Sequence, residues 1–265
     1  MNKKIDLLYI ILLTGLCWSL LIVGHELLGH GGAVLIVGGT PISVDAMYFD
    51  QDISGVTFWQ EKFVRANGSF INIIFAIIAA FWISRLRNKS TWLGYLLWLI
   101  IMMNCFQAGN YIAFGKFISP GMDWAMILND LEPALLWGIL EMCLGVSLIV
   151  FGFYYGRKYH YHFLDSKSSH IKQRFKIFGI PVLTATLISV SAALIMPTDD
   201  RLLMIWGGVG NSLFFLTGML VLVFIPSSKE KIKEVSSFEG NRRLLIASVI
   251  LMGFYLFVMS PGITF

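Results

Sequence analysis

Long apolar runs separated by short polar segments dominate this chain. A helix needs about 20 apolar residues to cross a hydrocarbon core of roughly 30 Å. The pattern predicts seven such helices, over residues 7–37, 70–83, 91–114, 134–155, 177–196, 203–225 and 244–259. The first run is long enough to contain a break, and the second is short unless it begins near Ala66. The chain is therefore predicted to be an all-α polytopic membrane protein.

The composition supports a membrane protein. Apolar residues make up 57% and charged residues 14% of the 265 residues, and the mean hydropathy is +0.74. Ordinary globular domains have about 45–50% apolar and about 25% charged residues. A chain with this balance cannot cover itself with polar surface, which excludes a soluble enzyme, a disordered linker and a secreted disulfide scaffold. We expect the lipid bilayer around it, no nucleic-acid partner, and an oligomeric state that the sequence leaves open.

The positive charges are distributed unevenly between the loops. Sixteen of the 20 Lys and Arg residues lie at the N-terminus or in the loops after the second, fourth and sixth runs. The alternate segments hold the other four, which are Lys62, Arg65, Lys116 and Arg201. Since positive residues are retained in cytoplasmic loops, this bias predicts a cytoplasmic N-terminus and a C-terminus on the opposite side.

The first run ends in the sequence GHELLGHGG, residues 24–32. Two histidines and a glutamate at membrane depth are costly and call for a partner that offsets the cost. A divalent metal fits this role, because neutral imidazoles bind zinc and a neighbouring carboxylate can take a proton from a water that the metal acidifies. His25 and His30 are therefore candidate zinc ligands, and Glu26 is the candidate general base.

The spacing of this motif is HExxxH, one residue longer than the common HExxH. On a regular helix His25 and His30 would point about 140° apart, because each residue turns the helix by about 100°. A π-bulge absorbs one extra residue and would return both side chains to one face. The spacing therefore predicts a π-bulge here, in a segment that Gly29 makes permissive.

The six letters HELLGH resemble the zinc motif of the dipeptidyl peptidase III family. This resemblance implies that the longer spacing can bind zinc through both histidines, with the glutamate as the base. It covers six residues, and the fold of that family is soluble.

A wider resemblance, over about the first 125 residues, is to intramembrane metalloproteases of the site-2 protease type, especially their compact bacterial relatives. The matching features follow the family's order: the His–Glu motif in an early span, Gly38-Gly39, strand-like segments at 44–49 and 55–59, an AGPxxN-like segment at 66–73, and Asp123 beyond the third span. The resemblance implies Asp123 as the third zinc ligand. It also implies a bacterial plasma membrane and a substrate that is a membrane protein or peptide.

Several other interpretations of the polar residues stay open. His25, Glu26 and His30 could be a hydrogen-bonded cluster, or could hold a structural or transported ion. Asp123 could cap a helix, because it follows Pro120-Gly121 and precedes a helical run. The runner-up ligands are Glu141, Asp130 and Glu132, and the residues that favour interhelical hydrogen bonding are Asn72, Asn104, Gln107 and Asn110.

Depth in the membrane connects these residues. His25 lies about 27 Å along the first helix from Leu7, and the polar residues of the third run lie about 20–29 Å from Thr91. Because successive spans alternate in direction, the first and third spans rise in the same direction. His25 and the polar residues of the third span therefore lie in the same outer part of the membrane.

We therefore predict a membrane-embedded zinc-dependent metallopeptidase. Residues 1–125 would form a three-helix catalytic core with a short hairpin after the first helix, and residues 126–265 a four-helix accessory region, together one integrated domain. His25, His30 and Asp123 would hold Zn²⁺, Glu26 would act as base, and Asn110 would donate to the oxyanion. The alternatives are a metal transporter and a non-proteolytic membrane hydrolase that use the same cluster.

Overall fold

The structure is a computed structural model that describes residues 6–164, 171–225 and 242–265, and most of these residues are helical. The longer helices are α1 (Leu7–Val23), α3 (Phe58–Arg85), α4 (Trp92–Ile118), α6 (Ala134–Tyr159), α8 (Ile180–Ile195), α9 (Arg201–Phe215) and α11 (Arg242–Phe254). The shorter ones are η1 (Gly24–Gly31), α2 (Gly32–Val37), α5 (Asp123–Leu128), η2 (His160–Phe163), α7 (Ile171–Arg174), η3 (Phe175–Gly179), α10 (Thr217–Phe224) and η5 (Tyr255–Met259).

Six helical segments among the described residues are long and apolar enough to cross a membrane. They are Leu7–Val37, Phe58–Arg85, Trp92–Ile118, Ala134–Phe163, Ile171–Ile195 and Arg242–Met259. Helices α9 and α10 meet at a 46° bend and make a seventh if they form one span. The architecture is that of a multi-pass α-helical membrane protein, as the apolar runs predict.

The second span begins earlier than predicted, at Phe58 rather than near residue 70. The cause is a capping box immediately before the helix. The Thr57 hydroxyl accepts the backbone N–H of Gln60, and the Gln60 side chain accepts the backbone N–H of Thr57 at 2.8 Å. This reciprocal pair satisfies donors that would otherwise lack partners at a helix start, so residues 58–69, which mix polar and apolar side chains, lengthen the helix.

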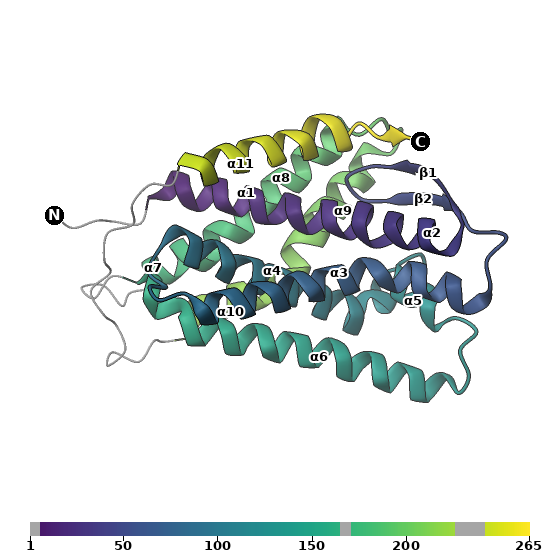
Figure 1. Cartoon of the computed structure of the whole chain (residues 1–265), viewed down its shortest axis with the longest axis horizontal. Helices are drawn as coiled ribbons and strands as arrows, with labels where there is room; N and C mark the ends of the chain where they lie inside the picture. Colours follow the sequence, from purple (N-terminus) through teal and green to yellow (C-terminus); the bar gives the residue numbers. More distant parts are fainter. Residues whose placement is uncertain (1–5, 165–170, 226–241) are drawn as a thin grey trace.

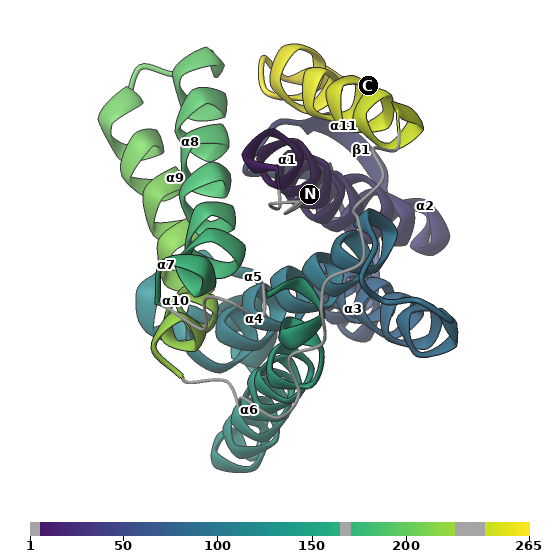
Figure 2. The same cartoon turned by 90° about the vertical axis from the view of Figure 1, so that its left-hand side faces the viewer.

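Helix α4 is the centre of the bundle. It packs against α1, α3, α6 and α9. Around it, α1 lies between α8 and α11 on one side, α9 accompanies α8, and α6 projects outward at the opposite side (Figure 2). Most of α4 is therefore buried in protein, whereas α6 presents most of its surface to the surroundings.

A small antiparallel sheet follows the first span. Its strands are β1 (Thr40–Val44), β2 (Phe49–Asp52) and β3 (Ile263–Thr264), in the order β2-β1-β3. The predicted hairpin exists, but the predicted strands at 44–49 and 55–59 are wrong. Asp45 accepts the N–H groups of Met47 and Tyr48 at 2.7 and 2.9 Å and so makes a turn between β1 and β2. Residues 55–57 lead into α3 instead of forming a strand.

The sheet, α2 and α5 gather at the end of the molecule opposite the start of α1 (Figure 1). Helix α5 follows the end of α4 after a short loop and packs against α3 and α4. This end therefore brings η1, α5 and the hairpin into one neighbourhood.

Candidate metal centre

Residues Gly24–Gly31 form a π-helical segment, η1, between α1 and α2. This confirms the π-bulge that the HExxxH spacing predicts. The wider turn places the rings of His25 and His30 on one side, with centroids 5.0 Å apart and planes at 76°. Both imidazoles are buried, whereas Leu28 between them is exposed and faces outward.

The backbone of α3 runs directly against both imidazoles. A Cβ atom on Gly68 would lie 2.6 Å from Nε2 of His25 and 2.7 Å from Nε2 of His30. On the facing helix, a Cβ on Gly29 would lie 2.5 Å from the Cα of Gly68. Only glycine permits this approach, and the Asn67 amide donates to the Gly29 carbonyl at 2.8 Å across the same contact.

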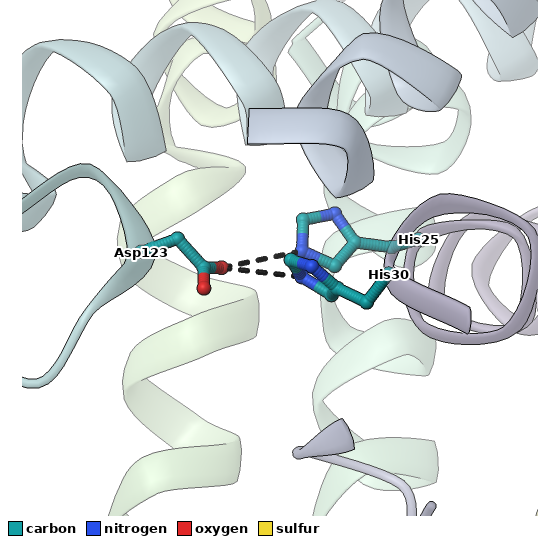
Figure 3. A group of neighbouring side chains, drawn as sticks. All are labelled: His25, His30 and Asp123. Carbon is teal, nitrogen blue, oxygen red and sulfur yellow. Dashed lines mark ion pairs between the residues drawn. The ribbon is translucent and has the colours of Figure 1, made fainter. Parts of the chain in front are cut away.

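Asp123 points toward both histidines (Figure 3). Its Oδ2 lies 3.3 Å from Nε2 of His30 and 3.8 Å from Nε2 of His25. Among the described residues, these three form a group that could hold a metal ion, with ligand atoms within 4.8 Å of one another. Zinc bonds of about 2.0–2.1 Å in a tetrahedron require ligand atoms roughly 3.3 Å apart, which these donors approach.

Asp123 is the first residue of α5, and its side chain does not cap the helix. The N-cap is Met122, which makes no side-chain capping bond. Instead the Tyr111 hydroxyl donates to Oδ2 of Asp123 at 2.9 Å and accepts its backbone N–H at 3.3 Å. Burial favours the neutral acid, but the interactions of the carboxylate with His25 and His30 outweigh it and hold the pKa of Asp123 below its usual range.

Helix α5 is fastened to α3 at both ends. The Trp124 indole donates to the Ser69 hydroxyl at 2.9 Å. At the other end, the Lys62 ammonium donates to the carbonyls of Met126 and Asn129 at 2.6 and 2.9 Å, where a cation favours a helix C-terminus. These contacts fix a helix of six residues that would not be stable alone, and so fix Asp123.

The Nδ1 atoms of both histidines, which point away from Asp123, form hydrogen bonds with α3. Nδ1 of His30 lies 2.9 Å from the carbonyl of Val64. Because a carbonyl only accepts, this Nδ1 carries a proton, which leaves Nε2 as the ring nitrogen that can bind a metal. Nδ1 of His25 lies 3.2 Å from the amide of Asn72, which also bonds Gln107 of α4 at 2.9 Å.

The Asn72 amide has a buried oxygen, Oδ1, without a partner among the described residues. An amide can present either its oxygen or its nitrogen to a neighbour. With the amides of Asn72 and Gln107 both turned, Oδ1 accepts from Nδ1 of His25 and from the Gln107 amide. That arrangement satisfies the orphaned oxygen and leaves Nε2 of His25 free to bind a metal.

Glu26 stands beside this cluster without a fixed partner. It is buried, and no hydrogen bond or ion pair to it occurs within the described ranges. Its side chain lines a cavity of about 530 Å³ that His25, His30 and Asp123 also line. The remaining walls come from the end of α1, the β1–β2 hairpin, α3, α4, the loop before α5, α5 and α9. The carboxylate therefore faces a space that water or a ligand can enter.

Other predicted residues lie elsewhere. Asn110 is not in the cavity wall, because its amide donates to the Phe215 carbonyl at 2.9 Å. Glu141 pairs with Lys116 at 2.7 Å. Three further residues do not join the metal group: Asn104, whose amide donates within its own helix to Ile100, and Asp130 and Glu132, which lie in the loop before α6.

Tyr111 is a site residue that the sequence analysis missed. Its hydroxyl contacts Asp123, and its ring lies edge-on to His25 with centroids 5.9 Å apart. A signal for it exists in the sequence, because Tyr111 follows Gln107 by four residues and so shares its helix face.

Comparisons with protein-family models, with curated proteins and with solved structures find no match to this chain. The case for a function therefore depends on the chemistry of the site.

Proposed function

We propose that this protein is a membrane-embedded zinc metallopeptidase that hydrolyses peptide bonds of membrane-associated substrates. The observation that carries the proposal is the unpartnered carboxylate of Glu26, facing the same cavity as a His–His–Asp group. A purely structural metal site has no need of a further free carboxylate. A catalytic zinc site has three protein ligands and one open position, with a base nearby.

His25, His30 and Asp123 would hold the zinc in this proposal. Bound there, zinc supplies Lewis-acid chemistry that polarises the scissile carbonyl and lowers the pKa of water. Glu26 takes the proton from the attacking water and passes it to the leaving amine. Tyr111 and Asn72 hold Asp123 and His25 in the orientation that this requires.

The cavity wall supports a peptide as the substrate. Strand β2 is an edge strand, and Phe49 and Gln51 within it line the cavity. An edge strand offers main-chain hydrogen bonds to an extended peptide, which a substrate helix needs once it unwinds. Within peptidases we propose the site-2 type, because the His–Glu motif, the Asn67–Gly68 segment and Asp123 meet at one cluster.

Replacing Glu26 with glutamine tests the proposal. The variant keeps the shape of the side chain and removes the base, so we expect hydrolysis to fall by about 10²–10⁴-fold while zinc binding stays. The assay uses the full-length, zinc-loaded protein in nanodiscs with a pool of fluorogenic apolar peptides. Glu141→Gln is the matched control, because it changes a buried carboxylate outside the cavity.

Undiminished hydrolysis by the Glu26→Gln variant would refute Glu26 as the base. No hydrolysis by the wild type, together with zinc uptake into proteoliposomes, would instead favour the transporter alternative.

A further inference from the structure

The cavity beside the metal centre contains one cationic side chain among its described lining residues, that of Arg65. Arg65 lies on α3 three residues before Gly68, whose backbone lies against both imidazoles. Residues three apart share a helix face. The guanidinium is therefore placed about one helical turn from the candidate metal ligands, in the same cavity.

The hydrogen-bonding capacity of Arg65 is only partly used. A guanidinium has five N–H donors. Within the described residues, Nε donates to Glu61 at 2.9 Å and Nη1 contacts the sulfur of Met126 at 2.7 Å. A thioether is a weak acceptor, and the side chain is still 20% exposed. Donors therefore remain for a ligand in the cavity.

The neighbouring cation Lys62 shows the contrast. Its ammonium donates to the backbone carbonyls of Met126 in α5 and of Asn129 directly after it, and it does not line the cavity. Lys62 thus fastens one helix to another. Arg65 has no comparable backbone partner in the described part of the chain.

The charge balance of the cavity favours an anion at Arg65. A divalent metal would offset the charges of Glu26 and Asp123, so that among the described lining residues only the positive charge of Arg65 remains, because its partner Glu61 does not line the cavity. The partner Glu61 is itself 37% exposed, and exposed pairs of this kind contribute little. A ligand carboxylate can therefore share the guanidinium at little cost.

We propose that Arg65 binds a carboxylate of the substrate, so that the peptidase selects apolar peptides carrying an acidic residue near the scissile bond. The rest of the wall fits the apolar part of such a peptide, because it includes Met122, Trp206 and Phe214. Planar bidentate recognition is the geometry in which arginine binds carboxylates most strongly. This inference rests on the proposed peptidase function and names its substrate class.

A peptide scan tests the inference without depending on turnover. Fluorescent eight-residue peptides of Ala and Leu carry a single Glu at successive positions, and each has a twin with Gln. Binding is measured by anisotropy on the zinc-loaded Glu26→Gln protein in phosphatidylcholine nanodiscs. At one or two positions we expect the Glu peptide to bind about tenfold more tightly than its twin, as a charge-assisted hydrogen bond predicts.

Variants of both ion-pair partners sharpen the result. Arg65→Gln should abolish the preference and Arg65→Lys should keep part of it. Glu61→Gln should increase the preference, because it removes the competing carboxylate. Equal affinities for all twins, or a preference that survives Arg65→Gln, would overturn the inference.

An anionic lipid headgroup is the other source of an oxyanion, and a second arm separates it. If phosphatidylglycerol raises the thermal stability of the wild type but not of Arg65→Gln, and each Glu peptide binds as tightly as its Gln twin, the headgroup is the occupant and the inference is wrong.

Hydrolysis by the wild type is measured separately. Glu-dependent binding without hydrolysis would refute the peptidase function and support the carboxylate site at Arg65. Hydrolysis without a preference for Glu peptides would support the peptidase function and refute the carboxylate site.

Discussion

Two groups of ionisable side chains lie within the helical bundle, and their charges are satisfied in opposite ways. Lys116 of α4 and Glu141 of α6 form a direct ion pair at 2.7 Å, outside the cavity. His25, His30 and Asp123 instead gather three atoms that could bind a metal ion at a cavity wall, with the carboxylate of Glu26 beside them. The first group is paired within the protein and does not line this cavity, although Oε1 of Glu141 is buried without a hydrogen-bond partner among the described residues.

The difference shows which buried polar groups indicate function. An ion pair between two protein side chains offsets part of its desolvation cost through their mutual attraction, so we assign it a structural role. Donor atoms that converge on a cavity retain that cost until a ligand offsets it. Four variants separate the two groups, from the largest expected effect to the smallest.

Gly68→Ala should disrupt the metal centre most. The new methyl group would lie within 2.7 Å of both Nε2 atoms and displace the imidazoles. We expect zinc affinity to fall by about 100-fold, as the cost of overpacking predicts, measured by competition with a chelator. Gly210→Ala is the control, since a Cβ there meets nothing within 4 Å in the same cavity. Equal affinities in the two variants would contradict the close contact.

Asn72→Leu should weaken zinc binding while the fold persists. The change removes the group that orients His25, and loss of such an outer partner lowers metal affinity by about 10–100-fold. Asn104→Leu is matched in residue type and burial, but its amide donates to the Ile100 carbonyl of its own helix. If Asn104→Leu lowers zinc affinity as much as Asn72→Leu, the orienting role is refuted.

Glu141→Ala should affect stability and leave zinc binding unchanged. It leaves the Lys116 ammonium without its ion-pair partner. We expect the free energy of unfolding to fall by about 2 kcal/mol, and not by more, because Lys116 is partly exposed to solvent. Unfolding in a detergent titration measures it. Replacing both residues, as Lys116→Leu with Glu141→Met, should restore most of the stability. Zinc loss in Glu141→Ala would show that the two groups are coupled.

Tyr111→Phe should have the smallest effect. It removes the hydroxyl that donates to Oδ2 of Asp123 and accepts its backbone N–H. The bond to Oδ2 orients the carboxylate, and its loss costs about 0.5–1.5 kcal/mol, or roughly a 3–10-fold loss of zinc affinity. Tyr95→Phe removes another buried hydroxyl, which donates to the Ile177 carbonyl away from the site. Zinc titration measures the affinity of both variants. Identical zinc affinities would show that Tyr111 does not contribute to the site.

The spans and the π-bulge could be predicted because each follows from local periodicity. Apolar length predicts membrane helices, and the 100° turn per residue makes the HExxxH spacing incompatible with a regular helix. The gathering of His25 with the polar residues of α4 could also be predicted from depth along the first and third spans, which rise in the same direction. The structure agrees, since Asn72 links His25 to Gln107.

The hairpin register and the exact residue of α4 at the site were not predictable from the sequence. The turn depends on hydrogen bonds to Asp45, and the third strand comes from the distant segment Ile263–Thr264. The four-residue spacing places Tyr111 on the helix face of Gln107, but it does not show which face of α4 meets the site, because α4 is buried on nearly all sides. The choice between Asn110 and Tyr111 therefore depended on tertiary packing.

The central claim is that His25, His30 and Asp123 hold one metal ion beside a free Glu26. Zinc stoichiometry with X-ray absorption at the zinc edge, on the purified full-length protein, tests it most directly. The account predicts one zinc per chain, bound by two imidazole nitrogens and oxygen at about 2.0–2.1 Å. Replacing either histidine or Asp123 with alanine should abolish stoichiometric binding. A wild type that binds no zinc, or one zinc retained after both histidines are replaced, would contradict the account.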